Sequence, residues 1–276
     1  MKSRIIEAIV ACGFLAGCGD VASDAPHFSD EVEWVVGIDF ATGHMCSGSI
    51  LSEHWILTAG HCVERAISLS SDADGDRLVI RQQATGEPSV IYEGTAELIL
   101  HPDYKGLGHI SHRWHDIGLV ALLDEALDAR HRARLSGTVR TFEALYFEEA
   151  NLFALGFGRT PDPDTGRCTE ELGPKKRYDG FVLRSFDGPI FGNAFSVRLD
   201  GRTDALCYGD SGAPLMFEAQ DVPHAFAVYS GPTRDKATFH GTLIGPNIAW
   251  FESVSSETPV PLECAEMAKD GWECFE

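Results

Sequence analysis

The feature of this 276-residue chain that most restricts its fold is a series of short apolar runs separated by Gly, Pro and Asp turn signals. Six runs lie at 34–38, 45–51, 55–58, 77–83, 89–100 and 117–123, and six more at 151–157, 181–186, 194–199, 213–218, 224–230 and 237–244. Short strands at this spacing are typical of sandwiches and barrels rather than of alternating strand–helix units. The stretch 125–144 is the expected linker, and its first half could form a helical turn or two. The pattern predicts an all-β protein with two lobes of about six strands each.

The charge balance argues against nucleic acid as a partner. The 42 Asp and Glu residues outnumber the 22 Lys and Arg residues, which gives a formal net charge of −20 at pH 7. A surface of this sign repels phosphate groups. The basic run Lys175-Lys176-Arg177 is too short to bind a polyanion against this charge.

The first 18 residues are typical of an export signal. Lys2 and Arg4 precede an apolar run that is too short to span a bilayer. The run ends in Leu15-Ala16-Gly17-Cys18, which resembles the lipobox of bacterial lipoproteins, where the cysteine carries the lipid. The alternative is an ordinary cleaved signal in which Cys18 has no role. Both interpretations predict an exported protein, either a cell-envelope lipoprotein or a secreted one, with membrane contact only through a lipid at Cys18. The acidic residues 19–33 would form a tether.

Six cysteines follow the signal, and their even number predicts disulfide bonds in an exported protein. They are Cys46, Cys62, Cys168, Cys207, Cys264 and Cys274. The sequence has no C-x-x-C pair of the kind that binds zinc.

Three stretches each carry a residue type that can take part in nucleophilic catalysis. His61 lies in LTAGHCV, Asp116 in HDIGLVAL and Ser211 in CYGDSGAPL. A serine hydroxyl needs a base to remove its proton, and histidine has a suitable pKa near neutrality. A carboxylate behind the imidazole would hold its tautomer. Glycine at position 209 would leave the backbone N–H groups of Gly209 and Ser211 free to bind a developing oxyanion.

The order His, Asp, Ser along the chain is that of the chymotrypsin-type proteases and not that of subtilisins or α/β-hydrolases. The stretches CSGSILSEHWILTAGHC, LILHPDY, DIGLVAL, LGFGRT and CYGDSGAPL together resemble the trypsin- and chymotrypsin-like serine proteases over about residues 34–250. The resemblance implies an all-β fold of two six-stranded antiparallel Greek-key β-barrels, with the active site in the cleft between them. Ser211 is then the nucleophile, His61 the base and Asp116 the residue that orients it. Ala213 departs from the family motif, in which a glycine is usual.

The resemblance also implies the domain organisation and the activity. We expect an N-terminal barrel at 34–135, a C-terminal barrel at 136–254 and a C-terminal extension at 255–276. The implied function is hydrolysis of peptide or protein substrates by a monomer that needs no cofactor. Two alternatives stay open. One is a protease-like binding module with little or no catalysis, and the other is an esterase that uses the same triad.

The substrate pocket would lie just before the serine. Ala205 falls where trypsins carry the aspartate that binds Lys or Arg, and Leu206 and Tyr208 follow it. A neutral pocket favours apolar residues at P1, the substrate residue before the cleaved bond, because a substrate cation buried there would have no partner.

The resemblance implies a Cys46–Cys62 bridge behind the histidine. Cys207 lacks the downstream partner that is usual in the family, and the loop of Cys168 runs near the serine in this fold. Two further pairs are therefore expected, Cys168–Cys207 and Cys264–Cys274, although the sequence alone allows other pairings of these four.

Asp210, directly before the serine, bears on activation. In most relatives this aspartate pairs with a new N-terminal ammonium group, which cleavage after a basic residue releases. No Lys or Arg occurs between Arg4 and Arg65, so such a cut cannot occur ahead of the first barrel. We expect the mature protein to be active without it. Arg159 is the expected internal partner of Asp210, and His44 is the alternative.

Two groups of residues allow a metal site but do not favour one. The histidines His109, His112 and His115 are spaced by three, which brings side chains together only in a helix. The aspartate-rich run 72–76 fails the EF-hand pattern, because Gln83 stands where the bidentate glutamate is needed. Some relatives bind calcium in this neighbourhood, so calcium stays open as an alternative to a solvated turn.

Overall fold

The fold was obtained as a computed structural model of the whole chain. The structure describes residues 27–28, 32–70, 77–83, 87–106, 115–128, 132–136, 152–162, 165, 167–172, 174–187, 196–200, 206–219, 222–232 and 238–255. Several residues singled out from the sequence lie outside this part of the chain. They are Cys18, the run 72–76, His109, His112, Ala205, Cys264 and Cys274.

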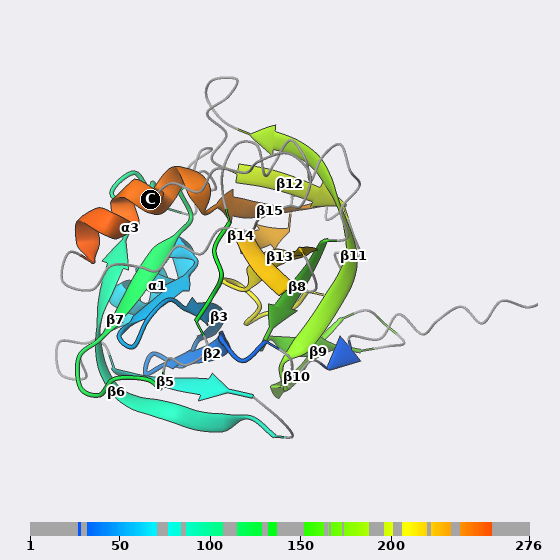
Figure 1. Cartoon of the computed structure of the whole chain (residues 1–276). Helices are drawn as coiled ribbons and strands as arrows, with labels where there is room; N and C mark the ends of the chain where they lie inside the picture. The colour runs from blue at the N-terminus through cyan, green and yellow to red at the C-terminus, as the bar shows by residue number, and fades with distance from the viewer. Residues whose placement is uncertain are drawn as a thin grey trace, which may run out of the picture.

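The first lobe is a closed barrel of six antiparallel strands in the order β2-β3-β4-β7-β6-β5 (Figure 1). The strands are β2 (Val35–Phe40), β3 (Met45–Ile50), β4 (Trp55–Thr58), β5 (Arg77–Gln82), β6 (Ser89–Leu100) and β7 (Gly118–Leu122). In β6 the buried residues Tyr92 and Ala96 alternate with exposed Glu93 and Glu97, so one face of the strand points into the barrel. β7 is buried along its whole length, and helix α1 (Gly60–Leu69) packs against it.

The second lobe is a curled sheet whose strands pair in the order β11-β12-β15-β14-β13-β8, and a further pairing of β11 with β8 joins its ends. The strands are β8 (Leu152–Gly156), β11 (Lys176–Asp187), β12 (Ser196–Asp200), β13 (Pro214–Ala219), β14 (Val222–Pro232) and β15 (Thr238–Leu243). The predicted all-β fold of two six-stranded barrels is therefore confirmed.

Short elements at the edges were not expected from the sequence. β1 (His27–Phe28) lies in the segment predicted to be a tether, yet it pairs with Lys176 and Arg177 of β11. β9 (Arg159–Pro161) and β10 (Cys168–Leu172) form a separate two-stranded sheet. Strand pairing over two or three residues gives no periodic signal that a sequence could reveal.

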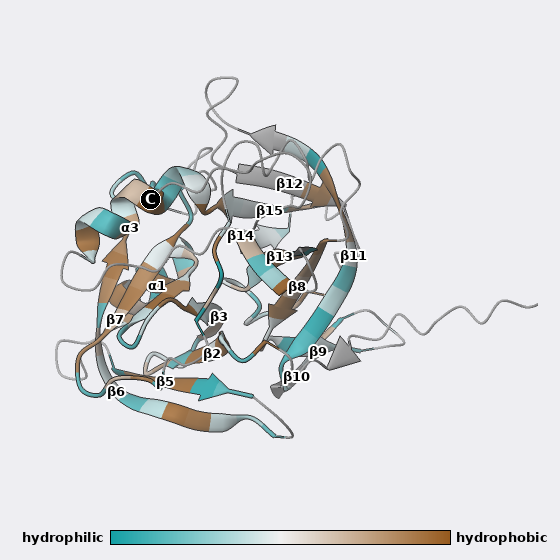
Figure 2. Ribbon diagram, viewed as in Figure 1, coloured by the Kyte–Doolittle hydropathy of each residue, from teal (hydrophilic) through white to brown (hydrophobic). Residues whose placement is uncertain are grey.

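One of the two hydrophobic clusters in the described residues spans both lobes, and the other lies within the second barrel. A single hydrophobic cluster contains Ile38 and Leu119 of the first barrel together with Phe153 and Met216 of the second. After β15 the chain turns through a short 3-10 helix η2 (Gly245–Asn247) into helix α3 (Ile248–Val254), which lies over the first barrel and buries Phe251 in this cluster (Figure 1). Figure 2 shows the hydrophobic stretches along β7, α1 and β8 that supply much of this interior. No helix in the described residues is long and apolar enough to cross a membrane.

Candidate active site

The pairing of β4 with β7 brings His61 and Asp116 together. The strands are antiparallel and Thr58 is opposite Gly118, so the end of β4 lies beside the start of β7. His61 follows β4 in the first turn of α1, and Asp116 precedes β7. The backbone N–H of His61 donates to Oδ1 of Asp116 at 2.7 Å, and its ring Nδ1 donates to Oδ2 at 2.8 Å. The imidazole is therefore held in one orientation, with Nε2 left to face other groups.

The electrostatics of this pair suit a general base. The Asp116 side chain is fully buried, whereas that of His61 keeps 14% of its surface exposed. Burial lowers the pKa of His61, but the charge of Asp116 and the hydrogen bond to it outweigh burial, and the pKa of His61 is raised above its ordinary value. The carboxylate thus stabilises the imidazolium form that accepting a proton would create.

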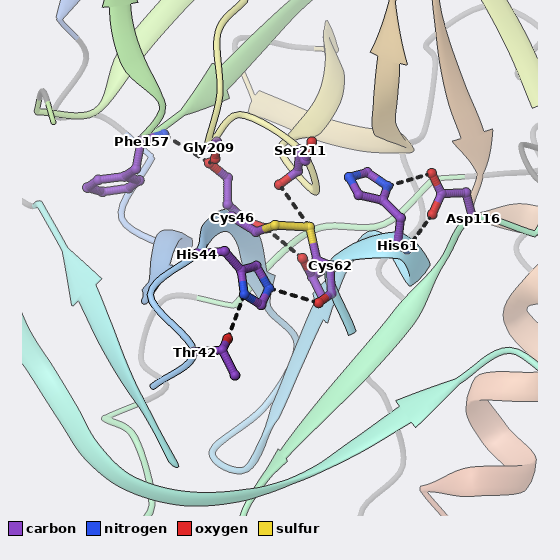
Figure 3. Close-up of a disulfide and its surroundings, with 11 residues drawn as sticks. Thr42, His44, Cys46, His61, Cys62, Asp116, Phe157, Gly209 and Ser211 are labelled. Atoms are coloured by element: carbon purple, nitrogen blue, oxygen red, sulfur yellow. Dashed lines mark hydrogen bonds and ion pairs between the residues drawn. A yellow bond between two sulfur atoms is a disulfide. The ribbon is translucent and has the colours of Figure 1, made fainter. Parts of the chain in front are cut away.

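Ser211 reaches the same place from the second barrel, on the loop 206–213 that we call the serine loop. Its carbonyl oxygen accepts the backbone N–H of Ser47 in β3 at 2.7 Å and lies 3.8 Å from Sγ of Cys62. Figure 3 shows Ser211 on one side of the His61 ring and Asp116 on the other. The structure therefore brings together the three residues predicted from the sequence.

Two glycines give the serine loop its shape. Gly209 has a φ of 98° and Gly212 a φ of 86°, values that favour glycine. At Gly212 an added Cβ would also lie 2.2 Å from the carbonyl oxygen of Ser47. No other residue fits there without moving the backbone, so the loop can lie directly against β3.

Asp210 is fully buried in a set of partners that differs from the expected one. Its Oδ1 accepts the backbone N–H of Gly158 at 2.8 Å, and its Oδ2 accepts the N–H of Cys207 at 2.8 Å and the hydroxyl of Tyr178 at 3.2 Å. Within the part of the chain that the structure describes, the positive charge of Lys176 acts on the carboxylate.

Lys176 is buried and donates its ammonium group to the carbonyl oxygen of Gly158. Burial lowers the pKa of Lys176, while the charge of Asp210 raises it. For Asp210, burial raises the pKa to about 6 against the opposing charge of Lys176. Lys176 thus occupies the role for which Arg159 was expected. The backbone N–H of Arg159 instead donates to the carbonyl oxygen of Tyr208 at 2.9 Å.

His44, the alternative partner of Asp210, is engaged elsewhere. Its ring stacks on Phe40 with centroids 4.5 Å apart. Its Nε2 donates to the carbonyl oxygen of Cys62 at 3.0 Å, and its Nδ1 accepts the hydroxyl of Thr42 at 2.7 Å (Figure 3). Burial lowers the pKa of His44. The ring therefore supports the Cys62 backbone next to His61 rather than Asp210.

Two disulfides bracket the site, and both match expected pairs. Cys46–Cys62 joins β3 to α1 with Cα atoms 6.4 Å apart. Cys168–Cys207 joins β10 to the serine loop with Cα atoms 5.6 Å apart.

The remaining predicted residues take varied positions. Leu206 is buried in the hydrophobic cluster of the second barrel, and Tyr208 is 77% exposed beside Gly209. His115 stacks on His101 with centroids 4.4 Å apart, and its Nδ1 lies 3.2 Å from Oδ1 of Asn247. This arrangement is a packing contact between the segment before Asp116 and the C-terminal elements. The described residues contain no group of three or more His, Cys, Asp or Glu side chains that could hold a metal ion.

Three residues around the site were missed at the sequence level. They are Lys176, which the sequence shows only as part of a basic run, and Tyr178 and Ser47, to which none of the predicted site motifs assigns a functional role. No local signal marks Lys176, because it lies ahead of the apolar run 181–186, in the part of β11 that this run does not cover.

Comparison with known proteins agrees with this geometry. A sequence model of the Trypsin family matches residues 23–239. Serine protease 1 of Homo sapiens is 29% identical over 185 residues, which cover 64% of this chain and 66% of that protein. Lectizyme of Glossina austeni is 31% identical over 242 residues, which cover 76% of this chain and 75% of that protein. This chain therefore belongs to the trypsin family of serine-type endopeptidases.

Proposed function

We propose that this protein cleaves peptide bonds with Ser211 as nucleophile, His61 as general base and acid, and Asp116 as the residue that orients His61. The observation that carries the proposal is the double hydrogen bond from His61 to a fully buried Asp116, with Ser211 on the opposite side of the ring (Figure 3). This geometry leaves Nε2 of His61 to accept the serine proton.

The chemistry follows from these positions. Ser211 Oγ attacks the substrate carbonyl carbon while its proton passes to Nε2 of His61. The imidazolium then gives that proton to the leaving amine, and an acyl-enzyme forms. Water, deprotonated by His61, attacks the acyl carbon and releases the acid with Ser211 restored. The backbone N–H groups of Gly209 and Ser211 bind the oxygen that becomes negative in each tetrahedral intermediate.

A fluorophosphonate probe tests the nucleophile. The probe should label the wild-type protein and a Ser253→Ala control, because Ser253 is an exposed residue of α3. It should not label Ser211→Ala, which should also cleave no peptide. Peptide and short-ester substrates measured side by side separate the alternatives. Hydrolysis of esters but not of peptides would indicate an esterase, and hydrolysis of no substrate would indicate a binding module. Robust proteolysis by Ser211→Ala would contradict the proposal.

We further propose that the enzyme prefers apolar P1 residues. Leu206 lies in an apolar cluster at the start of the serine loop, and the sequence places Ala205 before it. Burying an uncharged polar group without a partner costs roughly 2–7 kcal/mol, and a substrate cation buried against such apolar groups would cost more. A peptide-library profile should be dominated by apolar P1 residues, and dominance of Arg or Lys would refute this specificity.

The protein should be active without cleavage at its N-terminus. Asp210 already has two backbone N–H donors, the Tyr178 hydroxyl and the charge of Lys176, so no new ammonium group is needed to hold it. Material expressed without residues 1–18 should be active, and Lys176→Met should lose most activity while Arg159→Ala keeps it. An active form that begins between Val21 and Val36 and tolerates Lys176→Met would contradict this.

Export is in keeping with the two disulfides, which persist in oxidising compartments. We propose that Cys18 carries a lipid that anchors a monomer to the cell envelope. Metabolic labelling with a fatty acid should mark the wild type and spare Cys18→Ser. Equal labelling of the two would rule out this anchor.

A further inference from the structure

Ser47 in β3 is fully buried and forms hydrogen bonds through its hydroxyl, its N–H and its carbonyl. The hydroxyl donates to the carbonyl oxygen of Gly209 at 2.8 Å and accepts the backbone N–H of Phe157 at 2.9 Å. Its backbone N–H donates to the carbonyl oxygen of Ser211 at 2.7 Å, and its carbonyl accepts the Thr58 hydroxyl at 2.8 Å. One residue of the first barrel thus holds two carbonyls of the serine loop.

The Gly209 carbonyl lies between the two N–H groups assigned to the oxyanion. The peptide plane between Tyr208 and Gly209 carries the Gly209 N–H, and the plane between Asp210 and Ser211 carries the Ser211 N–H. The plane that lies between these two carries the Gly209 carbonyl. Glycine resists rotation of these planes less than any other residue, and Gly209 has a φ of 98°. The Ser47 hydroxyl supplies the restraint that the Gly209 backbone lacks.

The serine loop is also packed closely on this residue. A Cβ added at Gly212 would lie 2.2 Å from the Ser47 carbonyl oxygen and 2.3 Å from Oγ1 of Thr58. Phe157, whose N–H binds the Ser47 hydroxyl, lies next to Gly158, whose N–H binds Asp210. Ser47 therefore connects β3, the turn after β8 and the serine loop at one buried point.

We propose that Ser47 is a positioning residue that fixes the oxyanion-binding N–H groups of Gly209 and Ser211 relative to the attacking oxygen. The inference rests on the proposed peptidase function. Because it acts on groups that bind the tetrahedral intermediate and not the ground-state substrate, its loss lowers kcat and leaves KM nearly unchanged.

The test compares wild type, Ser47→Ala and Ser47→Gly, with Ser49→Ala as the matched control. Ser49 is buried on the same strand and is paired with Val35 and Leu57 of the first barrel. Removing one oxyanion donor costs about 10²- to 10³-fold in kcat, so a loosened pair should cost about 10- to 100-fold. Affinity for a peptide boronic acid, which forms a tetrahedral adduct with the serine, should weaken by the same factor as kcat/KM.

Ser47→Gly keeps the test valid if Ser47→Ala does not fold, because it removes Cβ together with the hydroxyl and so leaves no methyl group against the two unpaired polar atoms. Ser49→Ala should keep kcat within about twofold. A Ser47 variant that is folded by circular dichroism and keeps both kcat and boronate affinity would overturn the inference. Absence of cleavage and of fluorophosphonate labelling in the wild type would instead contradict the proposed function.

Discussion

The backbone N–H and the ring Nδ1–H of His61 donate to different oxygens of the same Asp116 carboxylate, at 2.7 and 2.8 Å. The carboxylate is fully buried, so water does not compete for these bonds. The Asp116 side chain therefore sets both the tautomer of the His61 ring and the position of the helix turn that carries it.

Asp116→Asn should therefore lower kcat by about 10⁴-fold, because an amide cannot accept both hydrogen bonds and favours the wrong tautomer. The acid limb of the pH profile should move as well. In the wild type the pKa of His61 is raised, so its ring becomes neutral and active only at higher pH. Without the Asp116 charge, the limb should shift to lower pH.

Steady-state kinetics between pH 5 and 9 measure both effects. Asp124→Asn is a suitable control, because Asp124 also accepts a backbone N–H, that of Thr95 at 2.6 Å, but lies at the surface. An unshifted acid limb in Asp116→Asn would show that Asp116 does not set the His61 pKa.

The pH dependence of stability should report on Asp210. Burial raises the folded-state pKa of this carboxyl to about 6, above the value of about 3.9 for an unfolded chain. The folded state then holds the proton more tightly than the unfolded state does. The charged carboxylate therefore destabilises the fold to its full extent above pH 6 and not at all below about pH 4. Between these two pH values the contribution of Asp210 to the free energy of unfolding should change by roughly 3 kcal/mol.

Urea unfolding of wild type and Asp210→Asn at several pH values between 4 and 8 measures this contribution. The free energy of unfolding of the wild type should fall relative to that of the variant as the pH rises from about 4 to about 6, and the difference should then level off. A constant difference across this range would mean that Asp210 does not titrate there.

Much of the fold was predictable because barrel strands have local signatures. In β6 the residues alternate between buried and exposed, and the triad residues sit in motifs that directly follow or precede apolar runs. Helix α1 and the β1–β11 pairing were missed. The helix begins inside the histidine motif without a side-chain cap, and β1 is two residues long.

The partner of Asp210 was not predictable for a different reason. Lys176 and Arg159 are both basic residues on elements next to Asp210, and the choice between them depends on strand register. Lys176 is opposite Gly156 in the β11–β8 pair, which directs it toward the Gly158 carbonyl and the Asp210 carboxylate. Register between distant strands follows from packing of the whole barrel and not from local sequence.

Loss of the Cys168–Cys207 disulfide should reduce both stability and activity. The bridge closes a loop with a sequence separation of 39, which is worth about 2–4 kcal/mol. The N–H of Cys207 also donates to Asp210 at 2.8 Å, so freeing Cys207 should loosen the serine loop. The double variant Cys168→Ala, Cys207→Ala should show a lower Tm and a lower kcat. An unchanged kcat at a temperature where the variant is folded would show that the disulfide does not hold the serine loop in its active conformation.

Gly158→Ala should damage the site without touching any catalytic group. A Cβ at this position would lie 2.4 Å from Cγ of Asp210 and 2.5 Å from each carboxylate oxygen, closer than real Cβ contacts. Asp210 is enclosed by hydrogen bonds, so it can move only by pulling on the serine loop. We expect kcat to fall at least tenfold and stability to fall by about 1–3 kcal/mol.

Gly180→Ala is the control, because its Cβ would meet nothing within 4 Å and only its φ of 80° opposes the change. That variant should lose roughly 1–2 kcal/mol of stability and keep its kcat. If Gly158→Ala instead kept full kcat at a similar loss of stability, the position of Asp210 would not control the serine loop.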